Sequence, residues 1–231
     1  MSDFAPLAGT LRAFPVDPFV MAAIRPMQFR DARGVAELHH AAMGESLWAQ
    51  LGIPFLQQLY QAMIDSPFFL GFVYVEDGRV RGFIAGSLDT QKMYADMARR
   101  RFMFLGPVAL VGAVRKPTAV RRLFETWRYF QLSGAERTPG ESLFCSFEPD
   151  LRGKRVSGHI NKVLFDELLA RGHTAVKITT ELVNESANRQ LKSWGFVDTH
   201  RFKFYDKDMA TYVLSLVGHP RLEATSRHPT V

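Results

Sequence analysis

The sequence predicts an α/β fold of the α+β class, in which strands and helices alternate around a mixed sheet. Three observations lead to this class. Apolar residues recur at helical spacing in some segments and alternate at strand spacing in others. The dipeptide Asp77-Gly78 separates two apolar runs, as in an antiparallel hairpin. In the second half a strand, a loop, a helix and a further strand follow one another, as in a parallel crossover unit.

The first half is expected to contribute three elements and the hairpin. Residues 24–43 predict a short strand, a turn and a helix capped by Asp31. Residues 53–64 carry apolar side chains at helical spacing. Residues 69–88 form the hairpin, because both positions of the Asp77-Gly78 turn favour positive φ.

The second half resumes the alternation after an insertion. The expected elements are a strand at 141–149, a helix at 156–172, a strand at 174–180, a short helix ending at Gly195, and strands at 201–205 and 210–216. The predicted order is therefore β-α-α-β-β, an insertion, then β-α-β-α-β-β. The loop before the first helix of this half lies at that helix's N-terminus.

Composition places this order in one domain at residues 23–217. The flanking segments 1–22 and 218–231 are expected to be a loosely attached extension and a flexible tail. Residues 89–140 form a basic and apolar helical insertion, with ten Lys and Arg against four Asp and Glu; this excess of six equals the net charge of the whole 231-residue chain. The single cysteine, Cys145, excludes an intrachain disulfide and favours the cytoplasm, and no spacing of Cys or His indicates a metal site.

The segment Pro149 to Gly158, "PDLRGKRVSG", has the composition of an anion-binding loop. A helix follows it, so several backbone N–H groups and the positive end of the helix dipole lie there. A diphosphate suits such a position. Taken alone, the segment is equally well interpreted as a solvated basic turn.

A second motif resolves that ambiguity. Asn184-Glu-Ser-Ala187 precedes a short helix that ends in Gly195-Phe196, and Arg152-Gly-Lys-Arg-Val-Ser157 stands before it at the end of a strand. Together they resemble the pyrophosphate loop (Arg/Gln-x-x-Gly-x-Gly/Ala) and the Asn-x-x-Ala landmark of the GNAT superfamily of acetyl-coenzyme A-dependent N-acyltransferases. The resemblance extends over about residues 24–216, without the insertion.

The resemblance implies a largely antiparallel central sheet flanked by helices, with two splayed strands forming the acyl-CoA cleft. It also implies acetyl-CoA as cosubstrate, without a metal. The cofactor-binding residues that it implies are Phe147, Arg152, Gly153, Lys154, Arg155, Val156, Ser157, Gly158, Asn184 and Asn188. Arg155 replaces a family glycine. We expect Arg155 to fit there if its backbone is right-handed helical. Leu191 stands where many members carry a tyrosine that protonates the departing thiolate.

Two residues are candidates for the chemistry itself. A backbone N–H at Phe147 is expected to face the thioester carbonyl as an oxyanion donor. Glu141 stands where one branch of the family carries its general base, although a carboxylate at a strand end is more often solvated. Cys145 is interpreted as a core residue. His39 and His40 are expected to be solvated or to lie in the acceptor cleft.

The predicted function is transfer of an acetyl group to a primary amine, which attacks the thioester directly. The acceptor amine is an amino sugar or another small molecule. The insertion leaves the acceptor open: it is a packed helical pair, a lid selecting an anionic acceptor, or a patch that contacts a membrane through residues 99–122. The alternatives to an enzyme are a GNAT-fold module that binds coenzyme A without turnover and a basic protein associated with a membrane or nucleic acid. Nucleic acid is not an expected partner, because no recognised motif accompanies the basic clusters. The location expected is the cytoplasm, with attachment to the inner membrane as a variant; the oligomeric state is left open.

Overall fold

A computed structural model describes residues 15–44, 46–100, 138–204 and 207–223. Within them a sheet of seven strands has the order β1-β2-β3-β4-β5-β7-β6. The strands are β1 Ile24–Pro26, β2 Phe69–Glu76, β3 Arg79–Ser87, β4 Glu141–Phe147, β5 Ala175–Glu181, β6 Val197–Phe204 and β7 Lys207–Ser215. Every neighbouring pair is antiparallel except β4 and β5, which are parallel. The mixed, largely antiparallel sheet is confirmed.

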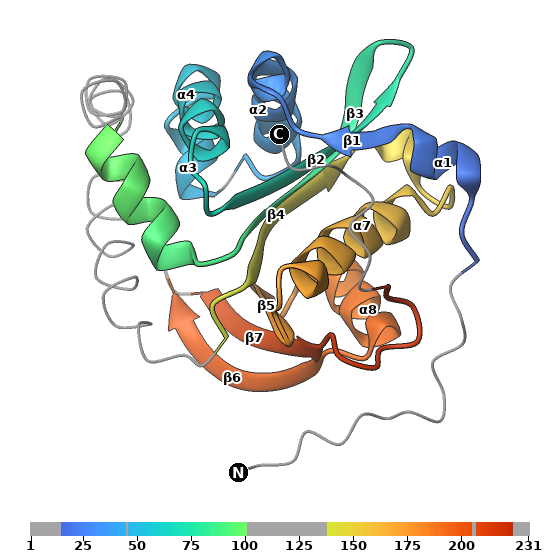
Figure 1. The fold of residues 1–231 in the computed structure, drawn as a ribbon. Helices are drawn as coiled ribbons and strands as arrows, with labels where there is room; N and C mark the ends of the chain where they lie inside the picture. Colours follow the sequence, from blue (N-terminus) through green and yellow to red (C-terminus); the bar gives the residue numbers. More distant parts are fainter. Residues whose placement is uncertain (1–14, 45, 101–137, 205–206, 224–231) are drawn as a thin grey trace.

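Helices cover both faces of this sheet. They are α1 Pro18–Ala22, α2 Ala32–Ala42, α3 Leu47–Gln50, α4 Ile53–Ile64, α7 Val156–Ala170 and α8 Glu185–Trp194, with short 3₁₀ turns at Phe29–Asp31 and Pro149–Leu151 and a further helix at residues 90–100. Helices α2 and α4 lie on one face and α7 and α8 on the other (Figure 1). Each face has its own apolar cluster, around Tyr60 and Phe83 on the first and around Phe165 and Leu164 on the second.

The hairpin of β2 and β3 forms as predicted. Asp77 has a φ of 51° and Gly78 a φ of 74°, so both turn positions are left-handed. This geometry matches the right-handed twist of the two strands and is the reason that Asp-Gly suits the turn.

Asp31 does not cap α2, contrary to the prediction. Its carboxylate accepts hydrogen bonds from the Arg25 guanidinium at 2.6 and 2.8 Å and from the Gln28 backbone N–H at 2.8 Å. No N–H of α2 donates to it. A buried carboxylate needs hydrogen-bond donors. The charged guanidinium provides two strong ones, whereas the neutral N–H groups at a helix end donate more weakly.

Described residues near both chain ends contact the domain. On the N-terminal side, the Asp17 backbone N–H donates to His159 Nε2 at 2.8 Å, and α1 packs on α7. On the C-terminal side, residues 218–223 lie against the domain. His219 stacks on Trp194, and the Glu223 N–H donates to Asp166 Oδ1 at 2.8 Å.

Only the two ends of the insertion, residues 89–100 and 138–140, belong to the part of the chain that the structure describes. Residues 90–100 are helical, whereas residues 101–137 lie outside the description. Most of the predicted membrane patch at residues 99–122 therefore lies outside it as well. Among the residues described, no helix has the length and apolar character needed to cross a membrane.

Candidate active site

The parallel strands β4 and β5 separate after a short contact. Their pairing is limited to Glu141 with Lys177 and Ser142 with Ile178. The β3–β4 register shifts between Ala85 and Gly86, so that Leu143 is an extra residue on β4. Such a bulge bends its strand away from the neighbour. Beyond it the two strands no longer pair, and we call the region between residues 143–147 and 179–181 the splayed cleft.

Backbone groups of β4 point into the splayed cleft. The Glu148 N–H donates to the Arg81 carbonyl at 2.9 Å, on the β3 side. Because orientation alternates along an antiparallel pair, the N–H groups of Phe147 and Cys145 point away from β3, toward β5. No residue of β5 pairs with β4 at that level. This arrangement is the one expected for an oxyanion donor at Phe147.

The outer end of the splayed cleft is the start of α7. Within the described chain, no protein acceptor takes the backbone N–H groups of Gly153, Arg155, Val156, Ser157 and Gly158. Arg152 and Lys154 are exposed, and open space adjoins Gly153. A helix N-terminus with free donors and surrounding cations can bind a diphosphate.

Arg155 has a left-handed backbone, with φ of 58° and ψ of 11°, and not the right-handed one predicted. The position thus retains the conformation for which a glycine is best suited, at a cost of about 1 kcal/mol or more for a residue with a Cβ. The Arg155 side chain is exposed. The Arg155 backbone carbonyl lies 2.8 Å from Nδ1 of His159, a residue of α7, and this contact fixes the turn.

A cluster around Arg81 attaches the loop to the hairpin. The Arg81 guanidinium donates to Glu148 at 2.7 Å and also contacts Glu76 and Asp150. Arg79 adds a second contact to Glu148 at 2.6 Å. Hydrogen bonding to Arg81 holds the pKa of both Glu148 and Asp150 below their usual range. The loop in front of α7 is therefore preorganised, by residues that local sequence patterns did not indicate.

Glu141 lies where β4 still pairs with β5, next to the inner end of the splayed cleft. Its Oε2 accepts from Thr90 Oγ1 at 2.7 Å and lies 3.8 Å from Lys177 Nζ, and its side chain is 15% exposed. Burial and the nearby Glu141 charge raise the pKa of Tyr94. Thr90 and Tyr94 belong to the start of the insertion, so the insertion contacts the site, as its place in the sequence predicts. The individual partners Thr90, Tyr94 and Lys177 were not predicted.

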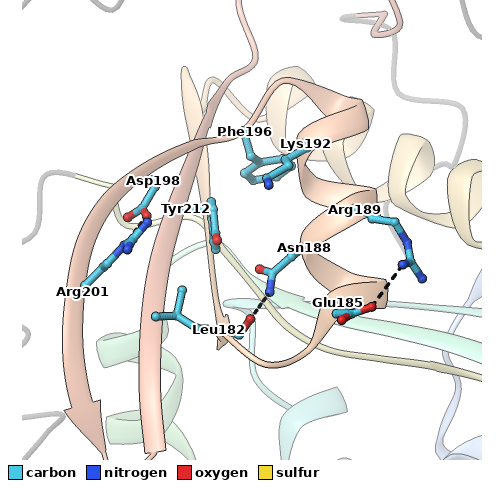
Figure 2. A pocket seen from close by; sticks show the side chains of 9 residues that line it. All are labelled: Leu182, Glu185, Asn188, Arg189, Lys192, Phe196, Asp198, Arg201 and Tyr212. Carbon is cyan, nitrogen blue, oxygen red and sulfur yellow. Dashed lines mark hydrogen bonds and ion pairs between the residues drawn. The ribbon is translucent and has the colours of Figure 1, made fainter.

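The Asn-x-x-Ala landmark has largely structural roles. Asn184 caps α8, with Oδ1 accepting from the Ala187 N–H at 3.2 Å. Asn188 donates to the Glu181 and Leu182 carbonyls at 3.2 and 2.9 Å, the second of which is drawn in Figure 2, and its binding of the cofactor stays a prediction. These bonds attach α8 to the end of β5. Leu191 is buried in the core, so it supplies no acid.

Burial leaves Cys145 protonated and His39 a weak base at neutral pH. Burial raises the pKa of the Cys145 thiol to about 12, which keeps it protonated. His39 is fully buried and not solvated as expected; its Nδ1 lies 2.7 Å from Tyr60 Oη. Burial, assisted by His40, lowers the His39 pKa to about 4. His40 itself is exposed, with Nδ1 3.2 Å from the Ala49 carbonyl. Over the described ranges, no group of His, Cys, Asp and Glu is arranged to hold a metal.

Several solved structures named as acetyltransferases share this fold. An N-acetyltransferase from Staphylococcus aureus matches with a TM-score of 0.53 and 16% identity, over 84% of this chain and 97% of that one. The ribosomal-protein-S18-alanine N-acetyltransferase of Escherichia coli matches with a TM-score of 0.52 and 12% identity, over 84% and 92%. A protein from Desulfovibrio desulfuricans assigned to the GNAT family matches with a TM-score of 0.55 and 12% identity, over 84% and 99%.

These likenesses show that the chain has the GNAT fold. No protein-family model matches the sequence, and a comparison with curated proteins finds no match.

Proposed function

We propose that this protein is an N-acetyltransferase that moves an acetyl group from acetyl-CoA to a primary amine by direct attack. The observation that supports it is the combination of free N–H donors at the start of α7 and along the adjoining end of β4. Unpaired amides at the start of α7 suit a diphosphate, and the Phe147 and Cys145 N–H groups suit a developing oxyanion. The fold adds support, because its structural neighbours are acetyltransferases.

The cofactor would lie along the splayed cleft. Its diphosphate would accept hydrogen bonds from the backbone of Gly153 and of residues 155–158. Its pantetheine amides would pair with the free edge of β4, as an added strand does. The thioester would then lie beside Phe147 and Cys145, where an N–H can stabilise negative charge on the carbonyl oxygen.

Glu141 would receive the proton of the acceptor. An amine attacks only when its lone pair is free, so a carboxylate beside the bulge of β4 can take the proton during attack. Thr90 and Lys177 orient this carboxylate. Leu191 is apolar and buried, so water would protonate the departing thiolate. A coenzyme A thiolate is stable enough to leave without strong acid assistance.

The acceptor would be a small-molecule amine, with an amino sugar as one candidate. The excess of Lys and Arg in residues 89–140 favours an anionic acceptor. We place the protein in the cytoplasm, on the basis of its single cysteine.

Turnover of acetyl-CoA with a panel of amines tests this function. We expect thiol release that depends on the amine. Glu141→Gln should lower kcat about a hundredfold at neutral pH and leave coenzyme A affinity unchanged. Glu37→Gln, an exposed carboxylate on α2, is the matched control. If coenzyme A binds but no amine supports turnover, the alternative of a binding module is favoured. The specific reason for considering that alternative is Leu191, which stands in place of the tyrosine that protonates the thiolate.

A further inference from the structure

His159 connects the start of α7 to the N-terminal segment of the chain. It lies in the first turn of α7 and is fully buried. Its Nδ1 lies 2.8 Å from the Arg155 backbone carbonyl oxygen, and its Nε2 lies 2.8 Å from the backbone nitrogen of Asp17. Asp17 is the N-cap of α1, and α1 packs on α7. One buried ring therefore joins two segments that lie far apart in the sequence.

These two contacts determine which nitrogen of the ring carries the proton. A carbonyl oxygen can only accept a hydrogen bond, so Nδ1 must carry the hydrogen that it donates to Arg155. A backbone N–H can only donate, so Nε2 must present its lone pair to Asp17. Only the neutral ring protonated at Nδ1 makes both contacts together. The Asp17 N–H thus selects the tautomer that donates to the Arg155 carbonyl.

The contact with Arg155 fixes the direction of a peptide group at the start of α7. The Arg155 carbonyl and the Val156 N–H belong to one planar trans peptide, so they point in opposite directions. The side chain of His159 and its backbone N–H, at 3.2 Å, both hold this carbonyl toward the body of α7. The Val156 N–H therefore points away from the helix, as a donor to the proposed diphosphate must.

The backbone of Arg155 makes this support important. Its left-handed conformation, with φ of 58° and ψ of 11°, is unfavourable for a residue with a Cβ. Such a conformation persists only where the surrounding contacts hold it. The Nδ1–H of His159 is one such contact, and it acts on the peptide that carries the Val156 N–H.

We propose that His159 is a positioning residue for the diphosphate of coenzyme A, and that the segment around Asp17 acts through it. The Asp17 N–H keeps the proton on Nδ1, the ring holds the Arg155 carbonyl, and the Val156 N–H is thereby directed at the ligand. This role rests on the proposed function, because it requires coenzyme A to bind at α7. The segment before residue 23, expected from the sequence to be a loosely attached extension, then contributes to cofactor affinity.

The ring nitrogens report the tautomer directly. In a ¹⁵N-labelled chain, a ring nitrogen with a proton and one without a proton resonate far apart, so spectra at mildly alkaline pH distinguish the two neutral tautomers. The chain has seven histidines, and the pair of signals missing from His159→Phe identifies this one. We expect the proton on Nδ1 and none on Nε2. A proton on Nε2 in the natural chain would overturn the proposal.

Two substitutions at Asp17 separate its N–H from its side chain. Proline removes the N–H and tolerates a φ near the observed −89°, whereas alanine keeps the N–H; both remove the carboxylate that caps α1. Asp17→Pro should place the proton on Nε2 in part of the molecules and shift the Val156 amide resonance. It should also weaken coenzyme A binding, measured by calorimetry, about threefold more than Asp17→Ala does. Equal effects of the two substitutions would contradict the role of the N–H.

His159→Phe removes both side-chain contacts and keeps a ring of similar size. Coenzyme A should bind about fivefold more weakly, or weaker still, because a buried hydrogen bond is lost at the site. His200→Phe, the same substitution at an exposed position on β6, should leave binding unchanged. Normal binding by folded His159→Phe would refute this role alone. Absence of coenzyme A binding to the natural chain would refute the proposed function together with this role.

Discussion

Placing a carboxylate at the second residue of α7 should change stability and cofactor affinity in opposite directions. Ser157→Asp puts a negative charge in the first turn of a helix whose initial N–H groups have no protein acceptor. A negative charge at that position interacts favourably with the helix dipole and typically adds about 0.3 to 1 kcal/mol of stability. The same charge would face the diphosphate of coenzyme A.

The size of the second effect follows from Coulomb's law. Two unit charges about 4 Å apart repel by about 1 kcal/mol in water and by about 4 kcal/mol at the effective dielectric constant of a protein surface. Two phosphoryl charges near position 157 therefore predict a loss of about 2 kcal/mol or more. Since about 1.4 kcal/mol is a tenfold change in affinity, we expect coenzyme A to bind at least about thirtyfold more weakly.

Calorimetry with coenzyme A and urea unfolding measure the two effects separately. Ser157→Ala should bind coenzyme A within a few-fold of the natural chain. Ser193→Asp, the same substitution at an exposed site on α8, should not change binding. Salt near 1 M should recover part of the lost affinity, because the charges are then screened. A folded Ser157→Asp variant that binds coenzyme A normally would refute the anion site at α7.

Three further predictions concern stability, each measured by urea unfolding. Arg155→Gly should be more stable than Arg155→Ala by about 1 kcal/mol, because φ is positive there; the reverse order would contradict the left-handed turn. Stability should fall by up to about 3 kcal/mol between pH 6.5 and 4, because only the unfolded chain protonates His39 readily, and His39→Gln should reduce this slope. Asp166→Ala should lower the free energy of unfolding by about 3 kcal/mol, because Lys162 stays buried while its partner at 2.9 Å is removed. The double variant Lys162→Met with Asp166→Leu should be nearly neutral. An equal loss of stability in both variants would exclude the charge as the cause.

Local patterns predict most of the fold. The bounds of α4, the Asp77-Gly78 hairpin and the order of elements around α7 follow from periodicity and turn residues. The errors involve hydrogen-bond partners that lie outside the element in question. The Asp31 carboxylate binds Arg25 and not the N-terminus of α2. His219 contacts Trp194, which is 25 positions away, and Glu223 contacts Asp166, which is 57 positions away. No local pattern encodes such a partner.

Sequence motifs predicted the loop and the strand of the candidate site, and the structure added the residues that hold them. The loop at 149–158 and the strand at 141–147 were identified, because glycine, basic residues and strand periodicity are local signals. The left-handed Arg155 was not predicted, because a residue with a Cβ gives no indication of positive φ. Arg81 and Thr90 were missed because their acidic partners are 67 and 51 residues away. Asn188 fits the motif but has a structural role.

A titration of the ¹⁵N-labelled chain with coenzyme A, followed by amide resonances, tests the central claim most directly. We expect the largest shifts at the backbone amides of Gly153 and residues 155–158, with further shifts at Cys145 and Phe147. Saturation with shifts confined to other regions, or unchanged amides at the start of α7 while coenzyme A binds, would contradict a diphosphate site at that helix.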